Sequence, residues 1–180
     1  MKKNWFIITA IGTALSGCGG IVVVNDPVTQ PNYIAGEENY AARNGSIRVE
    51  VAGDSFGLEQ DRFADLVVNQ MRVGYYRHGF FTREASGATD PRYKIVMMFN
   101  PDPSVSGDAL CSAPQPLKPV PRTPDERSSL LAAFCAGPMA RSEINGWVRL
   151  SGVEDRNFAQ LIDRVTAGIF PRRDIRRERL

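Results

Sequence analysis

Apolar residues recur at helical spacing in two stretches of the chain. Between Leu58 and His78, they return every three or four positions and line one helix face: Phe63, Leu66, Val67, Met71 and Tyr75. A second stripe begins after Glu154 or Asp155: Phe158, Leu161, Ile162, Val165 and Ile169. The pattern predicts two long amphipathic helices, which Gly79 and Pro171 end.

Four other segments have the patterns of β-strands. Residues 47–51 alternate apolar and charged side chains, and residues 141–153 also alternate, with Ile144, Gly146, Val148 and Leu150 on one side. Residues 80–83 form a short candidate strand. Residues 92–100 are apolar on both faces, which predicts a central strand covered on both sides.

The segment between these strands is irregular and rich in proline, and it carries the predicted short helix. Residues 101–123 contain six prolines: Pro101, Pro103, Pro114, Pro116, Pro119 and Pro121. Thr123-Pro124-Asp125-Glu126 then has the form of a capping box, with proline suited to the first turn. We therefore predict an insert followed by a helix from Thr123 to about Ala136.

Together, these elements predict an α+β fold. The simplest packing lays the two long helices on one face of a mixed sheet of three to five strands. The domain spans residues 46–171. Residues 18–45 are rich in turn residues and are predicted to be a flexible tether, although residues 21–24 are briefly strand-like.

The amino-terminal residues have the anatomy of a signal peptide. Lys2 and Lys3 precede an apolar run from Trp5 to Leu15, which is shorter than the about 20 residues of a spanning helix. Leu15-Ser16-Gly17-Cys18 resembles the lipobox of bacterial lipoproteins. The resemblance implies removal of residues 1–17 and acylation of Cys18. The alternative is an ordinary secretory signal with an incidental cysteine.

The resemblance also implies a location. Gly19 follows the cysteine, where an aspartate would retain an enterobacterial lipoprotein in the inner membrane. We therefore expect a lipid-anchored protein of the outer membrane that faces the periplasm. From Ser46 to Pro171, the order of elements resembles small α+β domains of Gram-negative envelope lipoproteins, including families of unknown function and auxiliary lipoproteins of transport systems. The closing pattern from Phe158 to Ile169-Phe170-Pro171 contributes to this resemblance, and the proline-rich insert departs from it.

The cysteine count predicts one disulfide. Of three cysteines, Cys18 is assigned to the lipid, which leaves Cys111 and Cys135 as an even pair in an oxidising compartment. We expect them to be bonded and to pin the insert. Two buried free thiols are the alternative.

The charge balance argues against nucleic acid as a partner. The chain has 22 basic and 20 acidic residues, and loss of Lys2 and Lys3 leaves the mature protein formally neutral. Only the tail, residues 172–180, is locally basic. It is either a solvated end or a contact for anionic headgroups or an acidic partner.

Candidate chemistry is sparse. Gly53-Asp54-Ser55-Phe56-Gly57 fits Gly-x-Ser-x-Gly and resembles the opening block of the Gly-Asp-Ser-Leu esterases, which makes a serine hydrolase using Ser55 one alternative. The chain has a single histidine, His78, and it is predicted to lie at the far end of the helix that follows Ser55, out of reach. We expect no catalytic residue, cofactor or metal site.

The sequence therefore predicts a non-enzymatic envelope lipoprotein. Its domain binds another envelope component or serves as a structural part of the envelope. The alternative is an auxiliary lipoprotein of an envelope transport or assembly system, which requires an apolar groove between the helices and the sheet.

Overall fold

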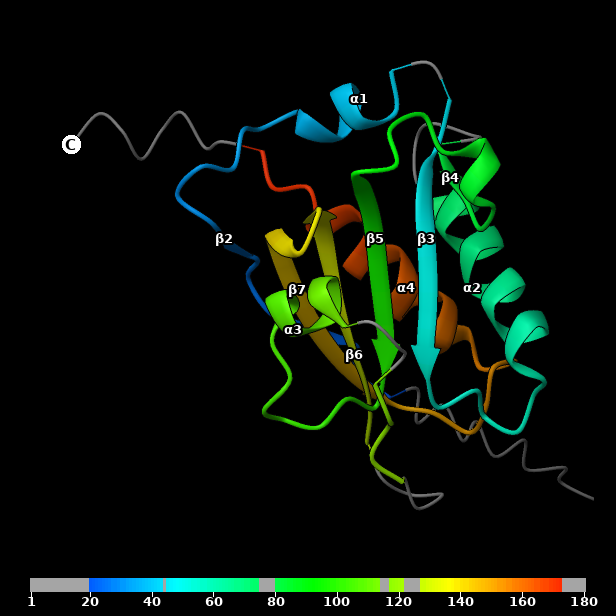
Figure 1. Ribbon diagram of the computed structural model, residues 1–180. Coiled ribbons are helices and arrows are strands. Elements are labelled where there is room, and N and C mark those ends of the chain that lie inside the picture. The colour runs from blue at the N-terminus through cyan, green and yellow to red at the C-terminus, as the bar shows by residue number, and fades with distance from the viewer. Residues whose placement is uncertain (1–19, 44, 75–79, 114–116, 122–126, 173–180) are drawn as a thin grey trace, which may run out of the picture.

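The computed structural model describes residues 20–43, 45–74, 80–113, 117–121 and 127–172. Within these ranges, a seven-stranded mixed sheet has the order β1-β7-β6-β5-β3-β4, and β2 also pairs with β7 (Figure 1). In chain order, the elements are β1 (Val23–Val24), β2 (Val28–Thr29), α1 (Glu37–Ala41), β3 (Ile47–Gly53), α2 (Gln60–Gly74), β4 (Phe81–Thr82), a 3-10 turn (Ala85–Gly87), β5 (Tyr93–Phe99), α3 (Gly107–Ser112), β6 (Arg127–Ala136), β7 (Met139–Arg149) and α4 (Arg156–Gly168).

The two long helices pack together on one face of the sheet, as predicted. The apolar stripes of α2 and α4 meet the inward residues of the central strands in one core. Phe63 of α2, Phe99 of β5 and Phe158 of α4 are all nearly inaccessible and their rings contact one another. Burying this apolar surface, at about 25 cal/mol per Å², is the main favourable contribution to folding.

The opposite face of the sheet is covered only in part. A second, smaller core lies there, formed by outward residues of the central strands and by Leu110 and Cys111 of α3. Figure 1 shows α3 in front of the sheet and α4 behind it. Strand β5 is therefore apolar on both faces because Ile95 and Met97 face the helices while Val96 and Met98 face α3. This confirms the prediction of a central strand.

The prediction of a helix from Thr123 to Ala136 is wrong for residues 127–136, which are the part of it that the structure describes. Residues 127–136 form β6, which pairs antiparallel with both β5 and β7. Leu130, Ala132 and Phe134 enter the main core, while Leu131, Ala133 and Cys135 enter the smaller one. Burial on both faces removes the alternation by which a strand is recognised. The helix that the insert does carry is α3.

The predicted sheet of three to five strands is too small, and part of the predicted tether is incorrect. β1 and β2 both pair with β7. Val22 and Ala41 are buried in the main core. Tyr93 and Arg141 both donate hydrogen bonds to the buried Glu37, at 3.1 and 2.9 Å. Most of the segment from residue 20 to residue 43 therefore lies against the domain, whereas residues 18, 19 and 44 are outside the described residues.

None of the helices within the described residues is long and apolar enough to cross a membrane.

Candidate functional site

A groove of about 460 Å³ lies on the outer face of the sheet. Strands β3 and β5 form its floor, the start of α2 forms one side, and α3 with the following insert forms the other. Apolar lining comes from Ala52, Val96, Leu110 and Leu117. Among the described helices, only the short α3 packs on this face, because α2 and α4 both pack on the opposite one. The groove is therefore the part of the sheet that remains open to a ligand.

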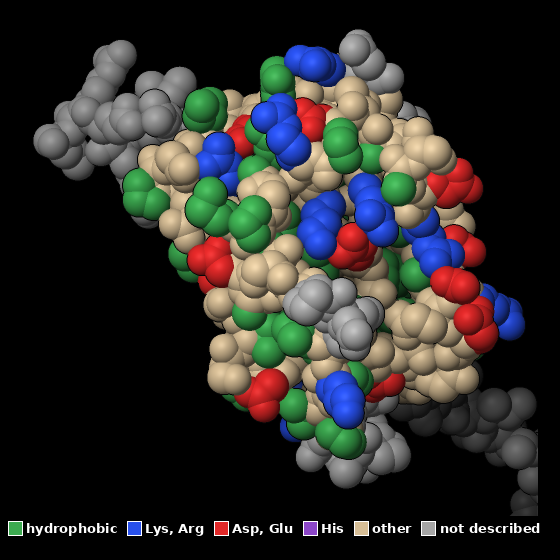
Figure 2. All heavy atoms as spheres, viewed as in Figure 1, with side chains coloured by type: hydrophobic (Ala, Val, Ile, Leu, Met, Phe, Trp, Pro, Cys, Tyr) green, Lys and Arg blue, Asp and Glu red, His purple; other side chains and the backbone are tan. Residues whose placement is uncertain are grey.

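Charged side chains of β3 and β5 stand on the floor of this groove. The ammonium group of Lys94 lies 2.9 Å from one carboxylate oxygen of Glu50, and Arg48 approaches the other at 3.4 Å. Arg48 and Lys94 are direct neighbours in the parallel register of the two strands. Figure 2 shows basic and acidic side chains gathered on this face between apolar ones.

A second ion cluster lies at the side of the groove that α2 forms. Arg83 donates hydrogen bonds to Asp65 at 2.8 Å and to Asp61 at 2.5 Å. These hydrogen bonds, that to Asp65 first, raise the pKa of Arg83 above its ordinary value. Arg83 and Asp61 line the groove together with Gln60. The lining thus contains three cations and two carboxylates: Arg48, Arg83, Lys94, Glu50 and Asp61.

One polar atom in the groove lacks a protein partner. The Nε atom of Arg48 is inaccessible and has no hydrogen-bond partner in the structure. A buried donor without an acceptor costs about 1–3 kcal/mol. This atom is closed to solvent, but the rest of the Arg48 side chain is 42% exposed. Its outer N–H groups, beside an apolar surface, suit a partner that brings oxygen acceptors.

Several contacts hold α3 and the insert beside the groove. The disulfide between Cys111 and Cys135 joins α3 to β6, with the two Cα atoms 5.6 Å apart. Asp108 accepts a hydrogen bond from the backbone of Ala140 at 2.7 Å, and Glu143 accepts one from Gly107. The predicted pairing of the two cysteines is therefore present, but it ties the insert to a strand rather than to a helix.

The loop that contains Ser55 serves as a structural turn. The Ser55 hydroxyl donates to the carbonyl oxygen of Leu58 at 2.6 Å, and Asp54 accepts from the backbone of Phe56 and from Asn100. Gly53 has a φ of +97°, and a Cβ there would lie 2.1 Å from the carbonyl oxygen of Phe99. The conformation and close packing of the turn therefore account for this glycine. A backbone carbonyl is no base, so this geometry does not activate Ser55.

Other sequence-based candidates lie outside the described residues. These are the acylation site Cys18, the single histidine His78 and the tail beyond Arg172. Within the described residues, no group of three or more histidine, cysteine or acidic side chains is arranged to hold a metal ion.

No local sequence pattern indicated the groove. Arg48 and Glu50 lie on the polar side of their strand, as the alternation of residues 47–51 predicts, but that pattern assigns them no role. The available signal was the charged position Lys94 in an otherwise apolar strand. That these three charges meet depends on the parallel pairing of β3 with β5, which the sequence does not specify.

Comparisons with known proteins are limited to structure. No protein family matches the sequence, and no curated protein matches it. Among solved structures, the chain is similar to a PelC dodecamer from Paraburkholderia phytofirmans, with a TM-score of 0.41 and 13% identity over 86% of this chain and 99% of that one. A single-substitution variant of PelC from the same organism, also a dodecamer, has a TM-score of 0.42 and is 14% identical over 85% of this chain and 99% of that one. TM-scores this low support no transfer of function.

Proposed function

We propose that the protein is a lipid-anchored component of the bacterial outer membrane, faces the periplasm, and binds another envelope component in the groove over β3 and β5. It acts by binding rather than by catalysis. The observation that carries the proposal is the groove itself: a region of sheet between the start of α2 and α3, with a mixed charged and apolar lining. The anchor is Cys18, in the sequence Leu15-Ser16-Gly17-Cys18.

The disulfide supports the proposed compartment. Disulfides persist in oxidising environments such as the periplasm and are rare in the cytosol. Cys111 and Cys135 bond across the outer face of the sheet, where Leu110 of α3 also packs into the smaller core. The bond therefore stabilises the side of the groove in the compartment to which the amino-terminal motif directs the chain.

The lining of the groove favours a protein segment as the partner. Arg48 and Lys94 offer hydrogen-bond donors, Glu50 offers acceptors, and Leu110 with Leu117 provides apolar contact. Such a mixture of charges with a small apolar centre is typical of an interface between proteins. The main core, by contrast, is filled by aromatic rings between the helices and the sheet. The apolar groove that a lipid carrier requires was expected at that place, so binding of a protein is favoured over transport of lipid.

Site-specific photo-crosslinking in intact cells tests this proposal. A photoreactive amino acid replaces Ala113 at the groove and, as the control, replaces Val73, which is 73% exposed on α2. We expect a defined envelope protein, identified by mass spectrometry, to be captured from position 113 and not from position 73. The identity of that protein also decides between a structural partner and a transport or assembly machine.

Charge reversal makes the result specific to the groove. Lys94→Glu places two carboxylates side by side on the groove floor, so we expect the crosslink at position 113 to be lost. Arg62→Glu is the matched control because Arg62 is exposed on α2 outside the groove lining. Equal capture from positions 113 and 73 would contradict the proposed binding site. So would capture from position 113 that Lys94→Glu leaves unchanged.

A further inference from the structure

The point where the chain leaves the sheet toward Cys18 is fixed in the structure. Val22 is buried, and its carbonyl oxygen accepts a hydrogen bond from Arg164 of α4 at 3.0 Å. Val23 and Val24 then pair with β7. Four residue steps separate Val22 from Cys18, which bounds the distance between their Cα atoms at about 14 Å. An acylated Cys18 is therefore held close to this part of the domain.

Because the connection between Cys18 and Val22 is short, the domain cannot lie far from the bilayer. The headgroup layer on each side of a bilayer is roughly 5–7 Å thick, so the acyl chains bring the surface around Val22 to the headgroups. Ile21 is 80% exposed at this point. An apolar side chain next to the anchor is suited to the boundary between headgroups and acyl chains.

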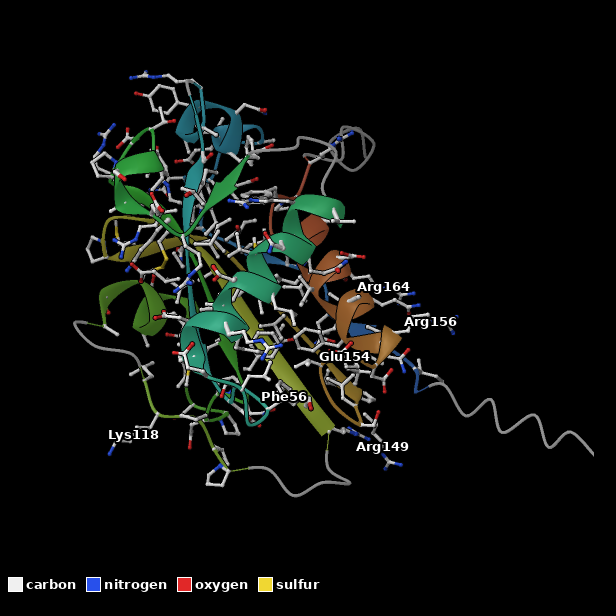
Figure 3. The ribbon with its side chains drawn as sticks, turned by 90° about the vertical axis from the view of Figure 1, so that its right-hand side faces the viewer. Phe56, Lys118, Arg149, Glu154, Arg156 and Arg164 are labelled. Atoms are coloured by element: carbon white, nitrogen blue, oxygen red, sulfur yellow. A yellow bond between two sulfur atoms is a disulfide. The ribbon has the colours of Figure 1, made fainter. Side chains whose placement is uncertain are left out.

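Three exposed arginines surround the point of exit. Arg149 is the last residue of β7 and lies against Gly20. A Cβ built on Gly20 would be 3.0 Å from the carbonyl oxygen of Arg149. Arg156 and Arg164 lie about two turns apart on one face of α4. Figure 3 shows the three arginines on the same side of the molecule. We call these three residues the arginine face.

Three acidic residues lie near this face, and two of them accept hydrogen bonds within the domain. Asp155 accepts a hydrogen bond from the backbone of Asn157, and Asp163 accepts one from Gln70. Glu154, which Figure 3 shows on the same side of the molecule as Arg156 and Arg149, is exposed. The exposed charged side chains of this face are therefore three arginines and one carboxylate, whereas Asp155 and Asp163 are partly buried and directed at neighbouring groups of the protein.

From this geometry we propose that the arginine face binds the anionic headgroups of the membrane that holds the lipid anchor, and so fixes the orientation of the domain. The inference rests on the proposed acylation of Cys18. In Figure 3, Lys118, from the insert beside the groove, lies on the side opposite the three arginines. With the arginine face on the bilayer, the groove points away from the membrane and toward a partner in the periplasm.

Fluorescence quenching on the reconstituted protein tests this orientation. The full protein is purified from cell membranes and placed in phosphatidylethanolamine vesicles with or without phosphatidylglycerol. A fluorescent amino acid replaces Ala167, which is exposed near Arg164 on α4, or Lys118, and the quencher is a lipid with a spin label on its headgroup. We expect stronger quenching at position 167 than at position 118 when phosphatidylglycerol is present.

Arginine variants separate electrostatic orientation from simple anchoring. Each arginine at an anionic surface contributes about a fivefold preference, so three give a preference on the order of 100-fold. The triple variant Arg149→Gln, Arg156→Gln, Arg164→Gln should lose the difference between the two positions, as should high salt. The corresponding triple lysine variant should keep it. Arg43→Gln, Arg62→Gln and Arg92→Gln together form the matched control because these arginines are exposed elsewhere.

The intact mass of the purified protein distinguishes two kinds of failure. A protein without acyl chains overturns both the proposed anchor and the orientation that depends on it. An acylated protein with equal quenching at the two positions overturns the orientation alone. Two further results would overturn the orientation. One is that the control triple variant loses the difference in quenching between positions 167 and 118. The other is that the glutamine variant of the arginine face keeps it.

Discussion

The two faces of the sheet are stabilised in different ways. The inner face is covered by α2 and α4 through a large apolar core with clustered aromatic rings. The outer face carries a smaller core, the short helix α3, a disulfide and several ion pairs. A large core needs no covalent support, whereas six residues of helix bury too little surface to hold themselves in place. The difference indicates that one face supplies stability and the other supplies a binding surface.

The largest effect is expected on the inner face. Phe63→Ala removes a fully buried ring that contacts Phe56, Phe99 and Phe158, and we expect it to lower the free energy of unfolding by about 3–5 kcal/mol. Chemical denaturation measures this change, and Phe63→Leu, which fills more of the space, should lose less. A loss below 1 kcal/mol would show that the inner core is not the main source of stability.

Removal of the disulfide tests the outer face. The double variant Cys111→Ala, Cys135→Ala opens a loop with a sequence separation of 24, and we expect a loss of roughly 3 kcal/mol. Hydrogen exchange should become faster in α3 and at the end of β6 before it changes in α2 and α4. The wild-type protein under reducing conditions is the control and should show the same pattern. Uniform acceleration over both faces would contradict the division of roles.

A smaller effect is expected at the start of α4, on the inner side. Asp155 accepts a hydrogen bond from the backbone N–H of Asn157, which lowers the pKa of its carboxyl group. Asp155→Ala should cost about 1 kcal/mol near neutral pH, as is usual for a lost helix cap.

The dependence of this effect on pH follows from the direction of the shift. Because the folded state lowers the pKa of Asp155, the stabilisation is present above the unfolded value of about 3.9 and is lost as the pH falls through the folded value. Unfolding curves of the wild type and the alanine variant should therefore converge in acid. Asp155→Asn should cap the helix without this titration, and a constant gap between wild type and alanine variant would refute the explanation.

The smallest effect on stability is expected in the groove. Lys94→Ala removes a partly exposed ion pair with Glu50, and such pairs contribute less than about 1 kcal/mol. Thermal unfolding should therefore change little, while the crosslink proposed at position 113 should weaken. Glu50→Ala is the companion variant because it removes the other member of the pair. A large loss of stability in either variant would mean that the groove charges are structural.

Local patterns were sufficient for the elements that have one buried face. The stripes from Phe63 to Met71 and from Phe158 to Ile169 predicted α2 and α4, and the alternation in residues 47–51 predicted β3. In these segments, a single periodicity separates buried from exposed positions. Signals within a few residues of one another therefore determined both the secondary structure and the side that faces the core.

The same reasoning failed where burial depends on distant partners. The run from Leu130 to Cys135 contains alanine and leucine, which favour helix, and only its position between β5 and β7 makes it a strand. Glu37 looked like part of a tether because its partner, Arg141, lies 104 residues away. The sequence contained both residues but no local sign of their contact.

By itself, the sequence determined the amino-terminal motif, the two amphipathic helices, the cysteine pair and the α+β class, because each is encoded in adjacent or regularly spaced residues. Only the tertiary structure decided that β6 is a strand, that residues 20–43 belong mostly to the domain, and that the groove and the arginine face lie on different sides. The reason is that strand pairing and helix docking bring together charges from separate parts of the chain. No local periodicity records those neighbours.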